Sequence, residues 1–338
     1  MQDRPLALAT EMEASEKSYL SETLARDVSL KAIPGTSGEA VSRGLLDDVE
    51  ILMPFIHSAV GREELEAMPN LRFIATRSTG YDHIDLEAAA ERGIPVSNVP
   101  AYGENTVAEH AFALILALSR KVHHAWTRTQ RGDYALEGLR GFDLYGKTLG
   151  VIGAGAIGLH VIRIAKGFGM KVLAFDVNQN QLLSDVLDFS YADLDELLEN
   201  SDIVTLHAPA IPATHHLINE DTLAKMKPES LLINTARGSL VDTAALAAAL
   251  DEGRLGGAGL DVFEGEEFMQ HEDELLYQTG AEDKLRLLLR AHALQRRPEV
   301  VITPHIGFNS EEALHRILDT TAENVRAFLA GEPKNLVG

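Results

Sequence analysis

The chain has 338 residues, a length typical of two domains of about 150 residues each. Its composition, 45% hydrophobic and 24% charged, is that of an ordinary globular protein and excludes a collagen-like or largely disordered chain. With no cysteine and a formal net charge of −21, it cannot form disulfides or thiolate zinc sites, and it lacks the basic excess typical of nucleic-acid-binding proteins.

Short hydrophobic runs alternate with helical patterns over the first hundred residues. The runs predicted as strands are residues 6–9, 29–33, 49–54, 71–76 and 95–99. Helices are predicted between them at residues 15–24 and 85–92. Strands that alternate with helices in this way indicate an α/β domain built on a parallel sheet.

A long helix is predicted over residues 104–130. Its first half is hydrophobic on nearly all sides, so we expect burial either in the core of its own domain or at an interface between subunits. The longest purely apolar run, residues 111–118, is far shorter than the roughly 20 residues that span a bilayer. Since the start of the chain shows no signal-peptide pattern, we expect a cytoplasmic protein with no membrane partner.

A second series of short runs rich in Val, Ile and Leu begins near residue 148. The runs predicted as strands are residues 148–152, 171–175, 203–206, 231–234, 259–262 and 300–303. Helices are predicted at residues 156–168, 194–199 and 243–252. The strands show no polar alternation, which is typical of a parallel sheet covered by helices on both faces. The sequence therefore predicts a second doubly wound α/β domain.

A glycine-rich turn, GAGAIG at residues 153–158, joins the first strand of this series to its first helix. The strand–GxGxxG–helix arrangement is typical of dinucleotide binding, because the glycines let the backbone turn tightly and approach a pyrophosphate closely. The N-terminus of the helix adds free N–H groups for the phosphates.

The next strand ends at Asp176, where a carboxylate would accept both hydroxyls of the adenosine ribose. The alternative is that Asp176 only caps a turn or a helix. No arginine follows immediately to bind a 2′-phosphate, so the expected cofactor is NAD rather than NADP.

Three polar residues, Arg237, Glu266 and His305, each follow a different predicted strand of the second series. In doubly wound sheets, ligands bind outside the carboxyl ends of the strands. An arginine for a carboxylate, a histidine for proton transfer and a glutamate that orients this histidine suit hydride chemistry on a 2-oxo acid. Each residue alone is more typical of a surface ion pair, but together behind a dinucleotide-binding turn they favour a catalytic site.

The sequence predicts no metal site. The pairs His123-His124 and His215-His216 have no carboxylate at a spacing typical of metal ligands, and the HExxH pattern is absent.

Taken together, the motifs resemble those of the D-isomer-specific 2-hydroxyacid dehydrogenase family, and within it the D-lactate dehydrogenase group, over nearly the whole chain. The matching strings are RSTGYDHID (77–85), VPAY (99–102), VAEH (107–110), GAGAIG (153–158), HAP (207–209), NTARG (234–238), DVFEGE (261–266) and TPH (303–305). The resemblance implies reversible hydride transfer between NADH and a small 2-oxo acid, with pyruvate and D-lactate as the expected pair.

The resemblance also implies roles for individual residues. His305 would be the acid–base group, with Glu266 rather than Glu264 as its partner, and Arg237 would bind the carboxylate and carbonyl of the substrate. Further substrate contacts are expected at Thr79, Gly80 and Tyr102. Contacts to NAD are expected at Gly153, Gly155, Ala156, Ile157, Gly158, Asp176, His207, Ala208, Pro209, Thr214, Thr235, Ala236 and Asp261.

Two doubly wound parallel-sheet domains are implied by the family. Residues 1–102 and 306–338 would form a discontinuous, flavodoxin-like substrate domain. Residues 103–305 would form a Rossmann NAD-binding domain, through which the chain would form a homodimer.

Other activities stay open as alternatives. The 39-residue interval from Glu266 to His305 favours D-lactate-type members, but His305-Ile306-Gly307 occurs in many other members. Glyoxylate or hydroxypyruvate reduction and 3-phosphoglycerate oxidation are therefore alternatives within the family. An NAD(H)-sensing, corepressor-like binding protein is an alternative of another class, which the complete set of three polar residues disfavours.

Overall fold

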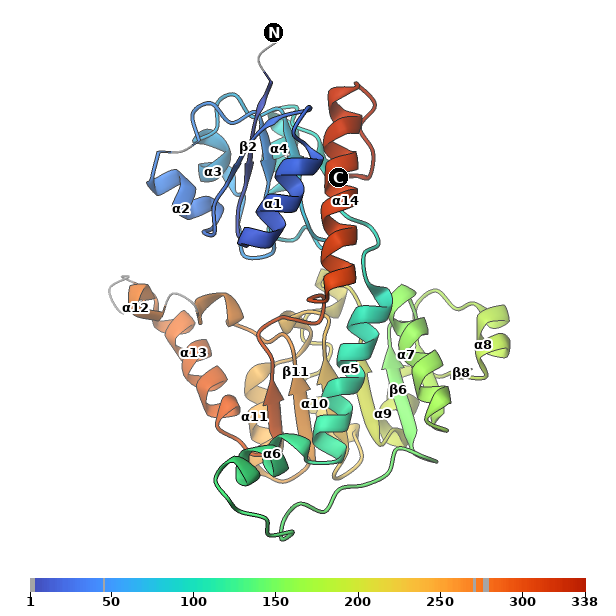
Figure 1. The fold of residues 1–338 in the computed structure, drawn as a ribbon. Coiled ribbons are helices and arrows are strands. Elements are labelled where there is room, and N and C mark those ends of the chain that lie inside the picture. The colour runs from blue at the N-terminus through green and yellow to red at the C-terminus, as the bar shows by residue number, and fades with distance from the viewer. Residues whose placement is uncertain (1–3, 45, 270–271, 276–279) are drawn as a thin grey trace. The chain divides into compact units, whose positions relative to one another are not determined.

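The computed structural model describes residues 4–44, 46–269, 272–275 and 280–338. Contacts divide the chain into two compact units, which are described separately (Figure 1): unit 1, Met1–Gly103 with Asn309–Gly338, and unit 2, Glu104–Phe308. The boundaries expected from the sequence, after residues 102 and 305, differ from this division by one and three residues.

Unit 1 contains a six-stranded sheet in the order β13-β5-β4-β3-β1-β2. Its strands are β1 Leu6–Ala9, β2 Ser29–Ala32, β3 Ile51–Met53, β4 Phe73–Ala75, β5 Val96–Ser97 and β13 Leu336–Val337. The first five strands are parallel in the order 2-1-3-4-5, which is the flavodoxin-like order. The sequence analysis did not predict β13, which pairs antiparallel with β5.

Helices cover both faces of this sheet. They are α1 Ala14–Thr23, α2 Ser37–Ser42, α3 Arg62–Glu66, α4 Leu86–Glu91 and α14 Glu311–Leu329. Successive side chains of a strand point to opposite faces, so Ala7 of β1 shares a core with Leu20 of α1 and Leu318 of α14. The next residue, Leu8, belongs to the core on the other face together with Leu65 of α3.

Unit 2 contains a seven-stranded sheet in the order β12-β11-β10-β9-β6-β7-β8. Its strands are β6 Thr148–Ile152, β7 Lys171–Phe175, β8 Ser190–Tyr191, β9 Ile203–Leu206, β10 Leu231–Asn234, β11 Gly257–Leu260 and β12 Val300–Ile302. All neighbours are parallel, and the order counted from β6 is 3-2-1-4-5-6-7, the Rossmann order with one further strand. The predicted α/β class with two parallel sheets is confirmed, with β13 as the antiparallel exception.

Helices also cover both faces of the sheet in unit 2 (Figure 1). The α-helices are α5 Glu104–Ser119, α6 Val122–Gln130, α7 Ala156–Gly167, α8 Gln181–Leu187, α9 Leu194–Asn200, α10 Glu220–Lys225, α11 Thr243–Asp251, α12 Glu272–Leu275 and α13 Glu282–Gln295. The short 3₁₀ turns are η1 Pro212–Thr214, η2 Gly238–Leu240 and η3 Glu266–Phe268.

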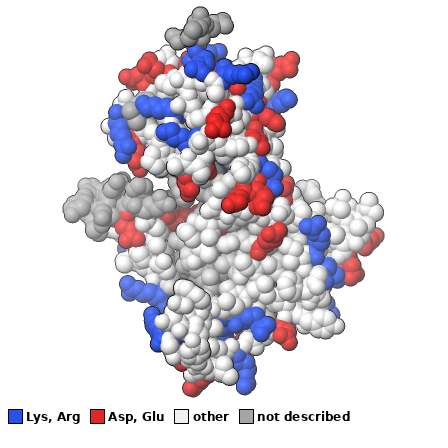
Figure 2. Space-filling model, viewed as in Figure 1, with Lys and Arg blue, Asp and Glu red and all other residues white. Residues whose placement is uncertain are grey.

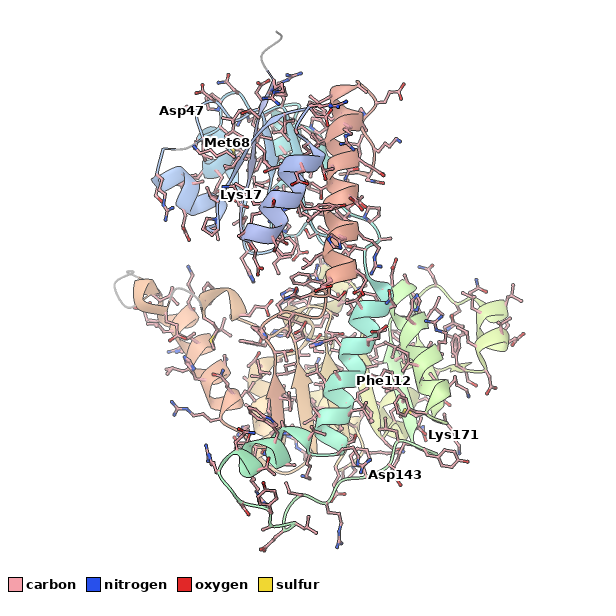
Figure 3. All side chains as sticks on the ribbon, in the orientation of Figure 1. Lys17, Asp47, Met68, Phe112, Asp143 and Lys171 are labelled. Carbon is pink, nitrogen blue, oxygen red and sulfur yellow. The ribbon has the colours of Figure 1, made fainter. Side chains whose placement is uncertain are left out.

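The prediction of one continuous helix over residues 104–130 is wrong. Lys121 has a left-handed φ of 52°, which is incompatible with a continuous α-helix, so the helix is interrupted between α5 and α6. The hydrophobic half, α5, is buried inside unit 2, where Phe112 (labelled in Figure 3) stacks on Phe168 with ring centroids 5.4 Å apart. In contrast, Val122 and Trp126 of α6 are 55% and 64% exposed.

The surface of the chain carries charges of both signs. On the face shown in Figure 2, acidic and basic side chains are interspersed on each unit. Within the part of the chain that the structure describes, no helix is long and apolar enough to cross a membrane.

Candidate active site

The strands of unit 2 end in register at one edge of the sheet. Ile152, Leu206, Asn234, Leu260 and Ile302 are successive partners across five neighbouring strands. The loops that follow these residues therefore begin side by side, and they carry most of the predicted site residues.

The glycine-rich turn lies between β6 and α7, which begins at Ala156. Gly153 has a φ of +96°, and a Cβ atom there would lie 2.6 Å from the carbonyl carbon of His207. A Cβ atom at Gly158 would lie 2.0 Å from the carbonyl oxygen of Gly153. Around Gly155 no atom would lie within 4 Å of a Cβ, so this part of the turn is open to a ligand.

Asp176 follows β7, and its carboxylate contacts the glycine-rich turn. Oδ2 accepts a hydrogen bond of 2.7 Å from the Ala154 N–H, and Oδ1 accepts one of 2.8 Å from the Asn178 N–H. Asp176 thus caps the turn, as in the alternative interpretation, but each oxygen keeps a second lone pair for a ribose hydroxyl. The next side chain, Val177, is 87% exposed and offers no charge to a 2′-phosphate.

We expect Asp176→Ala to reduce the preference for NADH over NADPH by on the order of a hundredfold. A carboxylate about 5 Å from a 2′-phosphate repels it by roughly 3 kcal/mol at an effective dielectric of about 20, and the variant would also lose the predicted hydrogen bonds to the ribose. The measurement is kcat/KM with each cofactor for the wild type and the variant. Equal use of NADPH and NADH by the wild type would contradict this role of Asp176.

The loops after β9 and β10 contain two buried polar atoms that fit a bound nucleotide. The Nε2 atom of His207 lies 2.9 Å from the Thr205 hydroxyl, and burial lowers the pKa of His207 to about 3, so the ring is neutral near pH 7. Among the described residues, His207 Nδ1 and Thr235 Oγ1 are buried without a hydrogen-bond partner. Buried polar atoms are nearly always paired, so a polar ligand is a suitable partner for both.

Other predicted NAD contacts are fixed by hydrogen bonds within the same loops or by packing against the cores of unit 2. The Thr214 hydroxyl donates to the carbonyl of Pro209 over 2.6 Å. The Ala236 N–H donates to the side-chain oxygen of the last residue of β10 over 3.0 Å. Ala208 and Ile157 are partly buried against the two cores of unit 2.

His305 and Glu266 are brought together although 39 residues separate them. Nδ1 of His305 lies 3.0 Å from Oε1 of Glu266, and the two side chains are 21% and 23% exposed. His305 has a left-handed φ of 54°, which is uncommon for a residue with a side chain. A partly buried histidine, oriented by a carboxylate and still accessible, is suited to acid–base chemistry.

Arg237 begins the turn after β10, and its Nη1 atom donates to the carbonyl of Ala236 over 2.8 Å. At the next residue, Gly238, a Cβ atom would lie 2.4 Å from the carbonyl carbon of Phe263. The Arg237 turn therefore packs directly against the loop that leads to Glu266.

Asp261, which is 1% exposed, is the centre of a hydrogen-bond network around the loop that carries His305. Its carboxylate accepts hydrogen bonds from the Thr303 hydroxyl (2.6 Å) and from the N–H groups of Ile306 (2.9 Å) and Gly307 (2.7 Å). Nε2 of His110, on α5, lies 3.2 Å from the same carboxylate. Burial alone raises the pKa of Asp261, but these hydrogen bonds outweigh burial and hold the pKa below its usual value.

This network fixes the backbone on both sides of His305. The family resemblance implies that Asp261 lies near the nicotinamide and supports the arrangement of Arg237 and His305, and its carboxylate does hold the loop that carries the histidine. Its contact with NAD stays a prediction. His110 lies in the VAEH string but was not predicted as a site residue. Its Nε2 atom also lies 3.0 Å from the Thr303 hydroxyl, and because the two residues are 193 positions apart, the sequence gives no sign of this contact.

We expect His110→Leu to lower the free energy of unfolding by about 1–2 kcal/mol, because a buried carboxylate loses one hydrogen-bond donor. Since the loop of His305 loses support, kcat should fall as well. Thermal unfolding and steady-state kinetics test both effects. His110→Gln, which keeps a donor, should restore most of both properties, and a His110→Leu enzyme with wild-type stability would contradict this role.

The expected substrate contacts of unit 1 lie in loops held by backbone carbonyls. The Thr79 hydroxyl donates to the carbonyl of Val99 over 2.7 Å. The Gly80 carbonyl accepts a hydrogen bond of 2.6 Å from the Ser78 hydroxyl. The carbonyl of Tyr102 accepts a hydrogen bond from Nε of Arg316. These bonds fix the conformation of both loops within unit 1.

The His215-His216 pair has a carboxylate nearby, contrary to the expectation from the spacing of the sequence. Glu264, which lies 48 residues further along the chain, reaches His216 with 2.7 Å between Oε1 and Nε2. The expectation of a missing partner was wrong because spacing along the chain says little about loops from different strands.

Comparison with known proteins gives one consistent result. The family model "D-isomer specific 2-hydroxyacid dehydrogenase, NAD binding domain" matches residues 112–307. A D-lactate dehydrogenase of Escherichia coli is 39% identical over 292 residues, 85% of this chain and 86% of that protein. A glyoxylate reductase of Korarchaeum cryptofilum is 39% identical over 295 residues, 86% of this chain and 83% of that protein. The crystal structure of a D-lactate dehydrogenase from Aquifex aeolicus, complexed with NAD and lactic acid, matches with a TM-score of 0.85 and 37% identity over 96% of each chain.

Proposed function

Since the chain belongs to the D-isomer specific 2-hydroxyacid dehydrogenase family, we propose that it reduces pyruvate to D-lactate with NADH in a reversible reaction. Family membership makes the chain an NAD-dependent oxidoreductase of 2-hydroxy acids. The proposal is the choice of pyruvate. It is supported by the likeness, over 96% of the chain, to a D-lactate dehydrogenase whose structure holds NAD and lactic acid.

The proposed mechanism assigns a task to each residue at the edge of the sheet. Bound NADH supplies the hydride. Arg237 binds the carboxylate of the oxo acid and polarises its carbonyl, and protonated His305 donates a proton to the carbonyl oxygen. Glu266, 3.0 Å from the imidazole, orients the ring and stabilises its positive charge. Substrate contacts of Thr79, Gly80 and Tyr102 are part of the same proposal.

The test is the rate of NADH oxidation with pyruvate, phenylpyruvate, glyoxylate and hydroxypyruvate at equal concentrations. We expect pyruvate to give the highest kcat/KM. A higher value with glyoxylate or hydroxypyruvate would overturn the choice of pyruvate and favour the activity in the name of the Korarchaeum relative. Failure of all four acids while NADH still binds would favour the nucleotide-sensing alternative.

We also propose that unit 2 forms a homodimer. Its segment after α5 exposes a group of large hydrophobic side chains to solvent, each more than half exposed: Val122, Trp126, Tyr134, Leu136 and Tyr145. Exposed groups of this kind commonly mark interfaces between proteins. Sedimentation of the wild type and of Trp126→Glu measures the association, and a monomeric wild type would overturn the proposed homodimer.

The cytoplasmic location expected from the sequence stays a prediction.

A further inference from the structure

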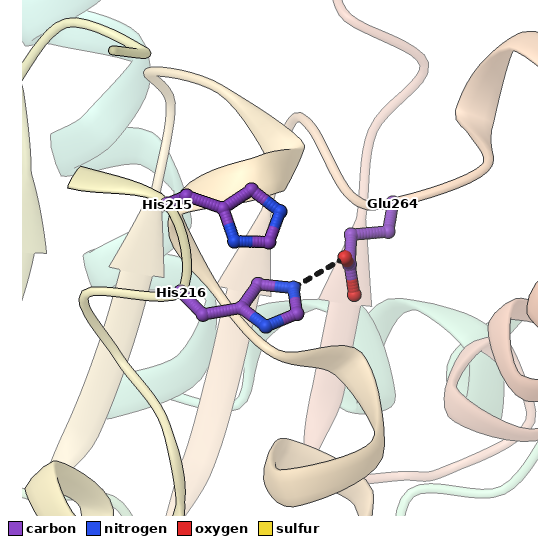
Figure 4. Close-up of side chains that lie close together, drawn as sticks. All are labelled: His215, His216 and Glu264. Carbon is purple, nitrogen blue, oxygen red and sulfur yellow. Dashed lines mark hydrogen bonds and ion pairs between the residues drawn. The ribbon is translucent and has the colours of Figure 1, made fainter. Parts of the chain in front are cut away.

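A second cluster of polar side chains lies in unit 2, apart from the His305–Glu266 pair: His215, His216 and Glu264 (Figure 4). The histidines follow η1, whereas Glu264 follows β11. One ring nitrogen of each histidine and one carboxylate oxygen all lie within 4.8 Å of one another. The two rings are stacked with centroids 4.0 Å apart, and both present a nitrogen toward Glu264 in the figure.

Both ring nitrogens of His216 face carboxylates. Nε2 lies 2.7 Å from Oε1 of Glu264, and Nδ1 lies 4.0 Å from Oδ2 of Asp242. A histidine that binds a metal through one nitrogen usually directs its other N–H toward a carboxylate, which orients the ring. Asp242 lies on the correct side of the ring, but 4.0 Å is longer than a hydrogen bond, so its side chain would have to move closer to take this supporting role.

The two central ligands are held in place before any ion binds. His216 has a left-handed φ of 49°, and its N–H donates to the carbonyl of Ser239 over 2.9 Å. The second oxygen of Glu264, Oε2, accepts a hydrogen bond of 2.9 Å from the N–H of Thr243. A strained backbone that is fixed by its surroundings is a common feature of functional sites. The side chain of His215, in contrast, is exposed.

We propose that His215, His216 and Glu264 form a binding site for a divalent transition-metal ion, best matched by Zn²⁺. Two imidazole nitrogens and one carboxylate oxygen, with water as the fourth ligand, make a tetrahedral set that zinc accepts. The Nε2–Oε1 distance has to open from 2.7 Å to about 3.3 Å, the ligand separation for bonds of about 2.0–2.1 Å. Metal binding through Nε2 requires the ring proton of His216 to lie on Nδ1, on the side of Asp242.

The ion would join segments that also support the candidate active site. Glu264 precedes Glu266 by two residues, and His216 is bonded to the turn that begins at Arg237. Zinc therefore stabilises unit 2 beside the active site, which makes thermal stability a readout independent of activity.

A second histidine pair, His123-His124, offers a matched control. Its rings also lie 4.0 Å apart, but they contact the carbonyl oxygens of Ala117 and Pro298. Among the residues that the structure describes, no third metal-ligating side chain joins this pair in a cluster. His124→Ala is therefore the control variant, since any non-specific affinity of paired histidines is shared by both sites.

The experiment is calorimetric titration of the chelator-treated full chain with ZnCl₂, followed by thermal unfolding with and without zinc. We expect one saturable zinc site per chain. When the free zinc concentration is a hundred times Kd, Tm should rise by roughly 5 °C. His215→Ala should weaken binding at least tenfold, because an exposed ligand is lost without disturbing the fold. His124→Ala should bind like the wild type.

Glu264→Gln provides an independent check, because the amide keeps the size of the side chain and a hydrogen bond but is a poor zinc ligand. It should abolish the zinc-dependent rise in Tm while the metal-free protein still unfolds cooperatively. Absence of saturable zinc binding to the wild type, or unchanged affinity in His215→Ala, would overturn the proposal. Loss of binding in His124→Ala with retention in His215→Ala would assign the ion to the other pair and overturn it as well.

Discussion

Replacing His305 with glutamine is expected to lower kcat for oxo-acid reduction by about 10³-fold, with NADH affinity unchanged. Glutamine keeps a polar side chain of similar reach but cannot deliver a proton to the carbonyl oxygen. The left-handed backbone of His305 is held by the Asp261 network and not by the imidazole, so the loop should keep its conformation. Steady-state kinetics and NADH fluorescence titration measure the two quantities.

Glu266→Gln serves as the companion variant. It keeps a hydrogen-bond acceptor for His305 but removes the charge that stabilises the protonated ring 3.0 Å away. We expect a smaller loss of kcat than for His305→Gln. If His305→Gln keeps more than a tenth of the wild-type kcat, the proton comes from another group and the assignment of His305 fails.

Arg237→Lys is expected to lower kcat/KM for the oxo acid by about a hundredfold, through a higher KM and a lower kcat. An arginine can contact a carboxylate and a carbonyl with two parallel N–H groups, whereas a lysine offers a single point charge. Loss of one hydrogen bond to a charged group corresponds to about 1.5–3 kcal/mol. The measurement is the oxo-acid concentration dependence at saturating NADH.

A matched arginine separates this effect from any general effect of replacing an arginine with lysine. Arg290 is exposed on α13, and Arg290→Lys should leave the kinetics at the wild-type level. A loss confined to NADH binding in Arg237→Lys would remove Arg237 from the substrate site and place it with the cofactor.

Much of unit 2 was predictable because its signals are local. The strands Thr148–Ile152, Lys171–Phe175, Ile203–Leu206 and Leu231–Asn234 have the bounds that the sequence analysis assigned them. Each is a short apolar run in a sheet buried on both faces, so neighbouring residues alone reveal it. The glycine-rich turn is recognisable in the same local way, because its glycine spacing lies between one strand and the helix that follows it, although the close approach of His207 to Gly153 is a tertiary contact.

The limits of such local signals are visible at the ends of elements. The break at Lys121 interrupts a pattern that reads as helical throughout, because one left-handed residue leaves no mark on hydrophobic periodicity. The strand Leu336–Val337 has two residues, too few for any pattern, and it exists because β5 offers an edge for pairing.

The sequence by itself determined the fold class, the nucleotide-binding turn and which strand ends carry polar residues. The tertiary structure decided which of these residues meet. His305 contacts Glu266, whereas Glu264, two residues before Glu266, contacts His216. His110, on a helix far from Asp261 in the sequence, completes the network of Asp261. The physical reason is that a parallel sheet aligns its carboxyl ends by strand order, so residues from distant segments become neighbours only once that order is formed.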